Sequence, residues 1–273
     1  MLPKVIKGQT LASTRQDLHG EQASREVLQE LCAQFPARLP LRQQHDMRRE
    51  TIGYIENVRV VADLGAPEHW LVKGDVYFTG ESVDEALRGF SFSYTQLIAG
   101  TAGDCELYLP YPHYNDQTLI RQLLAGDQSL LVGKVVRKEV TPSEVAIGVL
   151  LFLLGPAWQQ VWDARVKPAL ARLRDRLHQL TERGVSTDLV FQVEGPTGVP
   201  YQAQFIPDRS CPERCQTDVA LSEGHQRLRE YVRSDDTAKR KALRRVTLHF
   251  DARRDEYRVH HVEYADGSDL NVA

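Results

Sequence analysis

The sequence predicts an α+β fold, divided between a β-rich first domain and a smaller α+β second domain. Segments rich in β-branched and aromatic residues alternate with segments whose apolar residues recur at helical spacing. The character of the chain changes between residues 155 and 185, where a long helical pattern intervenes. A length of 273 residues also suits two domains of ordinary size.

Residues 1–155 are expected to form the β-rich domain. A helix is expected within residues 20–35, where apolar residues repeat on one face, and two shorter helices are expected at SVDEALRG and DQTLIRQLLAG. Strand-like composition, bounded by glycine and proline, marks much of the rest. The expected strands are KVIKG, TIGYIENVRVVADL, HWLVKGDVYF, FSFSYTQLIAG, SLLVGKVVRKEV and VAIGVLLFLL.

Residues 156–184 are expected to form a connecting helix, and residues 185–273 the smaller α+β domain. In the second domain, DLVFQVEG and VPYQAQFIPD predict two strands around a PTG turn. A charged helix is expected near residues 223–245. The stretch VTLHFDARRDEYRVHHVEYADG alternates with period two, which is typical of a hairpin.

The bulk properties of the chain argue against several classes of protein. A net charge of −3 argues against broad nucleic-acid binding, which depends on a positive surface. The four cysteines do not suggest a disulfide framework, so a reducing compartment such as the cytoplasm is expected. The first residues lack the apolar core of a signal peptide, and VAIGVLLFLL is too short to span a bilayer. We therefore expect a soluble protein with no membrane partner.

Two hydroxyl groups in FSFSYTQLIAG raise the question of chemistry. Ser91 and Ser93 would share one face of a strand, so alternation with a solvated face explains them without any function. Gly89, however, permits the close backbone approach that an oxyanion-binding site needs. A nucleophilic serine also needs a neighbouring base. The candidate bases are His45, His69 and His113.

The run from His45 to Thr95 resembles the core of the prohead (capsid maturation) serine proteases of tailed phages and their prophage relatives. The resemblance consists of a histidine, then Ile52-Gly53-Tyr54, then WLVKGDVY, then LRGFSFSY. The stretch KVIKGQTLASTRQDLHGEQASREVLQEL is also similar to the start of that family. The resemblance covers about the first 155 residues and implies a β-barrel or sandwich of the assemblin-like type with flanking helices.

The resemblance also implies roles for individual residues. Ser91 matches the nucleophile of the family and His45 matches its base. Glu144, in SEVAI, is similar to an acidic strand residue of the family and is one candidate for the third member. His113 is the other candidate, because the distant herpesvirus assemblin relatives use a second histidine. The third member would orient the imidazole while His45 takes the proton of Ser91.

The predicted function is a serine endopeptidase that cleaves a protein partner or itself, in phage capsid maturation or in a bacterial system with the same fold. The alternative is a non-catalytic interaction protein that keeps the barrel, while residues 185–273 recognise a partner in a bacterial anti-phage or stress-response assembly. Either protein could form a homo-oligomer. No cofactor is expected, and no metal, since Cys211 and Cys215 alone cannot fill a tetrahedral zinc site.

Overall fold

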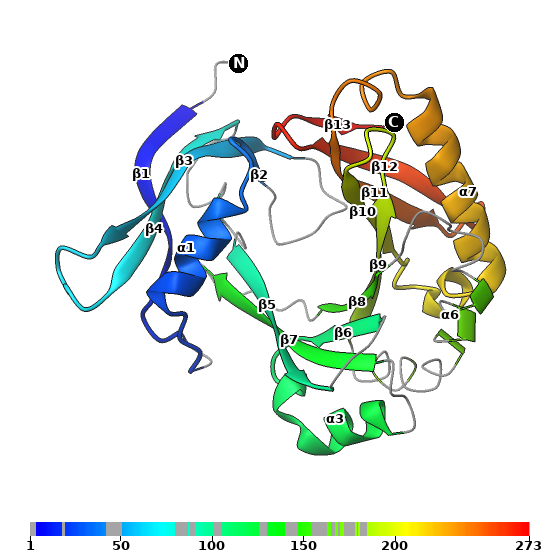
Figure 1. Ribbon diagram of the computed structural model, residues 1–273, viewed down its shortest axis with the longest axis horizontal. Coiled ribbons are helices and arrows are strands. Elements are labelled where there is room, and N and C mark those ends of the chain that lie inside the picture. Colours follow the sequence, from blue (N-terminus) through cyan, green and yellow to red (C-terminus); the bar gives the residue numbers. More distant parts are fainter. Residues whose placement is uncertain are drawn as a thin grey trace. The chain divides into compact units, whose positions relative to one another are not determined.

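Residues 4–17, 20–41, 51–79, 87, 91–100, 105–125, 130–139, 147–153, 163–164, 167–168, 170–171, 178, 180 and 185–272 are described by a computed structural model. This part of the chain has a mixed α+β architecture with much sheet and few helices. Its strands form two sheets, and the chain divides into two compact units (Figure 1). The first unit comprises Met1–Tyr94, Val136–Val145 and Asp266–Ser268, and the second comprises Thr95–Val135, Ala146–Ala265 and Asp269–Ala273.

The sheet of the first unit contains four antiparallel strands in the order β1-β4-β3-β2 (Figure 1). They are β1 (Lys4–Ser13), β2 (Leu39–Leu41), β3 (Gly53–Ala62) and β4 (Trp70–Phe78). Helix α1 (Arg25–Ala33) begins after Ser24, whose side chain accepts a hydrogen bond from the Val27 N–H. This bond satisfies one of the backbone donors that the first turn of a helix leaves unpaired. Ser24 therefore fixes the start of the helix within the predicted range of 20–35.

A hydrophobic core joins α1 to this sheet. Leu28 of the helix is fully buried, as are Ile55 of β3 and Val76 of β4. Burying an aliphatic side chain of this size stabilises a fold by about 1.5–3 kcal/mol, so the core supplies much of the driving force for the unit. Its buried members are Leu11, Ala12, Ala23, Leu28, Leu41, Ile55, Val72, Val76, Phe78 and Leu87.

Asp75 of β4 ties two irregular strands to the middle of the sheet. Its carboxylate accepts hydrogen bonds from the Gly8 N–H and from the Asn57 side chain, both at 2.9 Å. Gly8 in β1 and Asn57 in β3 have positive φ, and each lies at a register shift of its strand. The bond from Asn57, followed by that from Gly8, lowers the pKa of the Asp75 carboxyl below its usual range. The group is therefore charged at neutral pH and holds both bulges in place.

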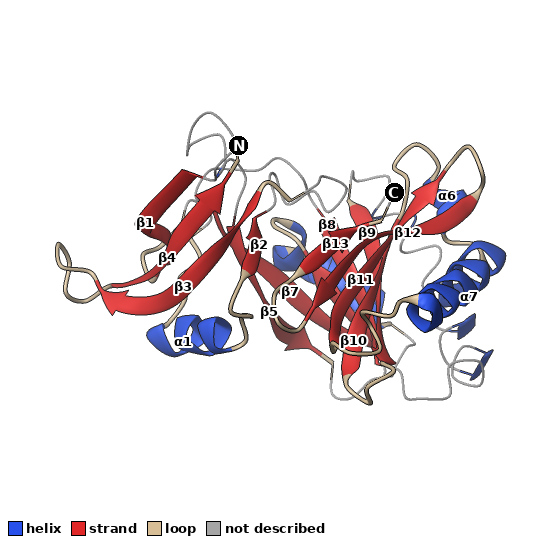
Figure 2. Ribbon diagram, turned by 90° about the horizontal axis from the view of Figure 1, so that it is seen from above, coloured by secondary structure: helices blue, strands red, loops and turns tan. Residues whose placement is uncertain are grey.

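The larger sheet is mixed and has nine strands in the order β13-β12-β11-β10-β9-β8-β6-β7-β5. Figure 2 shows its parallel neighbours β10 and β11 side by side. Most of this sheet belongs to the second unit, while residues 91–94 of β5 and 136–139 of β7 are grouped with the first. The strands are β5 (Ser91–Ala99), β6 (Cys105–Leu109), β7 (Leu130–Glu139), β8 (Ile147–Leu153), β9 (Ser186–Glu194), β10 (Pro200–Ile206), β11 (Leu243–Asp251), β12 (Glu256–Tyr264) and β13 (Asp269–Asn271).

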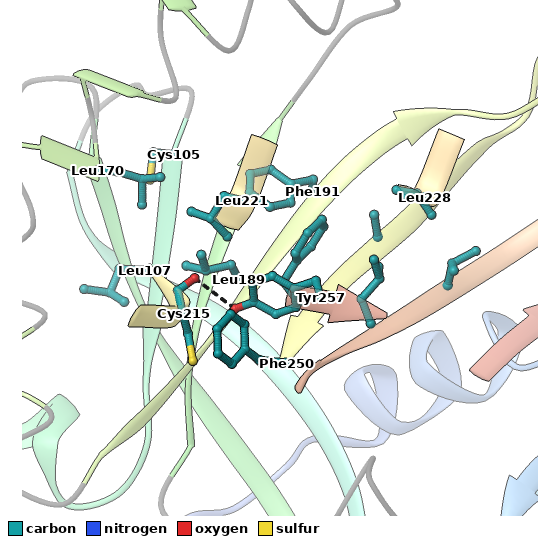
Figure 3. Close-up of a cluster of buried hydrophobic side chains, with 14 of the residues drawn as sticks. Cys105, Leu107, Leu170, Leu189, Phe191, Cys215, Leu221, Leu228, Phe250 and Tyr257 are labelled. Carbon is teal, nitrogen blue, oxygen red and sulfur yellow. Dashed lines mark hydrogen bonds between the residues drawn. The ribbon is translucent and has the colours of Figure 1, made fainter. Parts of the chain in front are cut away.

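The helices of the second unit bury their apolar sides in its core. They are α3 (Gln117–Leu124), α6 (Pro212–Cys215) and α7 (Asp218–Ser234), with a 3-10 turn, η2 (His113–Asn115). At the centre of the core, the Tyr257 ring lies edge-to-face with that of Phe205, at 4.9 Å between centroids. The Tyr257 hydroxyl donates a hydrogen bond to the Cys215 carbonyl at 3.1 Å (Figure 3). This bond satisfies a buried polar group and fixes α6 against β12.

Most predicted elements that fall in the described residues are confirmed. The strands β9 and β10 form an antiparallel pair around Gly198, which has the positive φ that a glycine tolerates. The strands β11 and β12 form the predicted hairpin. Of the predicted connecting helix, the described residues all have helical backbone, and Leu170 and Leu180 are buried.

The predicted barrel is not found, because neither sheet closes among the described strands. The four-stranded sheet ends at β1 and β2, and the nine-stranded sheet ends at β13 and β5. The division into domains 1–155 and 185–273, with a connecting helix at 156–184, stays a prediction. The strand β8 pairs in parallel with β9, so one sheet continues across residues 156–184. Periodicity in a sequence shows which residues form strands, whereas it does not show which strands become neighbours.

Candidate active site

The four predicted catalytic residues differ in how far the structure describes them. Ser91 is the first residue of β5, and its side chain is not described. His45 and Glu144 lie outside the described residues. His113 opens the turn η2 and is half-buried, and it belongs to the second unit, whereas Ser91 is grouped with the first. The structure therefore describes the chain segments that lead to these residues, and the site is built from those segments.

Hydrogen bonds tie three chain segments together at one end of the four-stranded sheet. The Ile52 N–H donates to the Leu41 carbonyl at 3.1 Å, so the segment that contains His45 leaves and re-enters the sheet at one place. The Ile52 carbonyl accepts from both the N–H and the hydroxyl of Thr79, at 2.9 and 3.1 Å. The segment that leads toward Ser91 therefore leaves the sheet at the same end.

The same hydrophobic core anchors the chain just before each of the two principal candidates. Leu41 is fully buried and lies four residues before His45. Leu87, which is 4% exposed, lies four residues before Ser91. Leu41 and Leu87 belong to one shared core, so the described chain is fixed in that core four residues before each candidate. Sequence reasoning missed this role of Leu87, although its apolar character within a polar stretch was visible.

Gly53, the glycine of the Ile-Gly-Tyr signature, has a steric reason to be a glycine. It begins β3 and pairs with Leu41 on one side and with Phe78 on the other. A Cβ atom at this position would lie 1.9 Å from the Tyr77 carbonyl oxygen and 2.8 Å from the Phe78 Cα. Both are backbone atoms that cannot rotate away, so the signature marks a close approach of strands at the end of the sheet described above.

Replacing Gly53 by alanine is expected to destabilise the first unit by at least about 2 kcal/mol, because the strands must separate to admit the methyl group. The matched control is Gly65→Ala, where a Cβ would meet its nearest atom at 3.6 Å and the expected change is within about 0.5 kcal/mol. Chemical denaturation of both variants measures the difference. Equal stability of the two variants would contradict the packing argument.

His69, which the sequence offers as another base, takes part in a structural cluster. Its Nδ1 lies 3.3 Å from the Thr14 hydroxyl, which in turn accepts a hydrogen bond from the Trp70 N–H at 2.9 Å. Nearby, Arg15 pairs with Asp63 at 2.6 Å. Thr14 is buried, so it cannot meet a substrate. These contacts join the end of β1 to the start of β4. Because His69 has this structural role, it is a suitable control for His45.

The described residues contain no group of three or more His, Cys, Asp or Glu side chains that could hold a metal ion. Cys211 and Cys215 are free thiols, and the Cys215 thiol donates to the Cys211 carbonyl at 3.2 Å. Burial raises the pKa of Cys215 to about 12, so this thiol is neutral and unreactive. Of the helices that the structure describes, none combines the length and the apolar character that crossing a bilayer requires.

Comparison of the chain with models of known protein families, with curated proteins and with solved structures gave no match.

Proposed function

We propose that the chain is a serine endopeptidase that cleaves a protein partner or itself, with Ser91 as the nucleophile and His45 as the general base. The observation that carries the proposal is that Leu41 and Leu87, each four residues before one of these side chains, lie in one buried core. The proposal includes a first unit of the prohead-protease type, on the strength of the sequence resemblance. Capsid maturation, or a bacterial system with the same fold, is the setting that this resemblance implies.

In the proposed mechanism, His45 accepts the proton of the Ser91 hydroxyl as its oxygen attacks a peptide carbonyl. Backbone N–H groups beside Ser91 stabilise the oxyanion, a contribution of about 10²–10³ in rate for each donor. The protonated His45 then donates to the leaving amine, and water hydrolyses the acyl-enzyme. Glu144 or His113 orients the imidazole of His45.

Covalent labelling with a fluorophosphonate tests the nucleophile without knowledge of the substrate. The expected result is one label per chain on wild-type protein, located at Ser91 by peptide mass spectrometry, and none on Ser91→Ala. Ser93→Ala is the matched control and should take the label, because Ser93 is two residues along the same strand. A label on Ser93, or equal labelling of Ser91→Ala, would overturn the assignment.

Self-cleavage provides a second readout. An intact-mass measurement should show fragments that are lost in Ser91→Ala. A wild-type chain that takes no label and never cleaves itself or a partner would instead favour the non-catalytic interaction protein, in which the first unit is a scaffold.

A further inference from the structure

Two cysteines of the second unit lie next to each other at the short helix α6. Cys211 directly precedes this helix, and Cys215 is its last residue. The N–H and the thiol of Cys215 both donate to the Cys211 carbonyl, at 3.4 and 3.2 Å. The two thiol groups also lie within hydrogen-bonding distance of each other. One turn of backbone therefore holds the two sulfur atoms close together.

The spacing of these residues meets the requirements of a disulfide bond. The bond from the Cys215 N–H to the Cys211 carbonyl closes one helical turn, in which residues four apart have Cα atoms about 6 Å apart. Disulfides join cysteines whose Cα atoms are roughly 4.4–6.8 Å apart. The side chains must also converge, and the contact between the thiols meets this second requirement. Rotation of the two side chains is then enough to bring the sulfur atoms into bonding distance.

Asp208 orients both cysteines. Its carbonyl accepts a hydrogen bond from the Cys211 N–H at 3.2 Å, and its N–H donates to the Cys215 sulfur at 3.2 Å. A sulfur atom in a disulfide keeps its lone pairs, so it can still accept the bond from Asp208. The bond lost on closure is the one that the Cys215 thiol donates to the Cys211 carbonyl, and thiols are weak donors. The surrounding turn therefore suits both the open and the closed pair.

The two sulfur atoms differ in their access to solvent. Cys211 is half-buried and follows the exposed residues Arg209 and Ser210, so a small solute can approach it. Cys215 is fully buried in the core, where the Tyr257 hydroxyl donates to its carbonyl (Figure 3). Burial raises the pKa of its thiol, which is therefore neutral and unreactive toward solutes. Cys211 must react first, and Cys215 can react only with the sulfur atom beside it.

We propose that Cys211 and Cys215 form a redox-sensitive lock, which closes to a disulfide when the chain meets a small disulfide of the glutathione type. The Cys211 thiol gives its proton to solvent, and its sulfur attacks one sulfur of the small disulfide. A mixed disulfide forms, and one glutathione thiolate leaves and takes up a proton. The Cys215 thiol then gives its proton to solvent as its sulfur attacks the Cys211 sulfur, and the second glutathione leaves in the same way. Two protein thiols are oxidised, and one small disulfide is reduced to two thiols.

Closure of the lock should stabilise the second unit, whether or not Ser91 has a catalytic role. The crosslink removes conformations from the unfolded chain, although the loop that it closes, residues 211–215, is short. We therefore expect the unfolding temperature of the oxidised chain to exceed that of the reduced chain by about 2–6 °C. Calorimetry of the two forms measures the difference. An oxidised chain that unfolds at the same temperature as the reduced chain overturns the lock.

Counting alkylated cysteines tests whether the pair closes. The full chain is equilibrated in buffers with different ratios of reduced to oxidised glutathione, quenched with acid, unfolded, alkylated with N-ethylmaleimide and weighed by intact-mass spectrometry. The chain has four cysteines, so the reduced chain should take four labels and the closed chain two, with no added glutathione. Return to a reducing buffer should restore the lost labels. A chain that takes four labels in every buffer overturns the proposal.

Single variants test the order of the two steps. Cys215→Ser should stop at the mixed disulfide, with one glutathione on Cys211, whereas Cys211→Ser should carry no glutathione on Cys215. Cys32→Ser is the matched control, because Cys32 is a half-buried free thiol of the first unit, and this variant should still close. Thermal unfolding confirms that each variant is folded. Closure that persists in Cys211→Ser, or that is lost in Cys32→Ser, overturns the proposal.

Discussion

Replacing His45 by glutamine is expected to slow the phosphonylation of Ser91 by about three to four orders of magnitude at pH 7.5. The hydroxyl of serine is a weak nucleophile at neutral pH, and the imidazole supplies the base that activates it. Leu41 and Leu87 hold the two segments in one core, so loss of the base should act on rate and leave the fold intact. The rate constant is obtained from labelling reactions that are stopped at a series of times and analysed by intact-mass spectrometry.

The matched control for this experiment is His69→Gln. His69 contacts Thr14 and lies in the same unit, so its replacement tests a general effect of losing a histidine there. Its labelling rate is expected to stay within about twofold of wild type. Equal loss of rate in both variants would show that His45 acts through stability rather than as a base.

The third member of the proposed triad can be identified by comparing Glu144→Gln with His113→Gln in the same labelling assay. The orienting residue should slow labelling strongly, while the other position should change it little.

Local sequence features predicted the strands well because one face of each strand is buried. In β12, Tyr257 is fully buried and Arg258 is exposed, which is the alternation visible in the sequence. The end of α7 was less predictable. The charged pattern extends to residue 245, whereas the helix ends at Ser234. Asp235 accepts a hydrogen bond from the Thr237 N–H at 2.8 Å, and such local bonds compete with the helix.

The pairing of strands was not predictable in the same way. Nothing in the composition of β8 indicates that it pairs in parallel with β9 rather than within a closed barrel. For the site, the sequence pointed to Gly53, and the structure supplies the reason in the nearby Tyr77 carbonyl. Only the structure shows that Leu41 and Leu87 lie in the same core, because these residues are 46 positions apart in sequence and no local pattern links them.

His225 makes the second unit sensitive to acid. It lies on the buried face of α7 and is 2% exposed. Burial, assisted by the positive charge of Arg229, lowers the pKa of the imidazole to about 3. Between pH 6.5 and that value, the unfolded chain binds a proton that the folded chain does not bind. The free energy of unfolding must therefore fall as the pH drops through this window.

We expect this histidine to contribute a loss of about 1.4 kcal/mol for each pH unit between pH 6 and pH 4. Denaturant unfolding at a series of pH values measures the slope, and His225→Gln should be less steep than wild type by about that amount. Carboxylates also titrate near pH 4, so the difference between the two proteins is the relevant quantity. His178→Gln is the control, because the side chain of His178 is 54% exposed. His178→Gln should show the same dependence of unfolding free energy on pH as wild type. If His225→Gln shows it too, the buried imidazole takes up its proton without unfolding the helix, and the prediction is wrong.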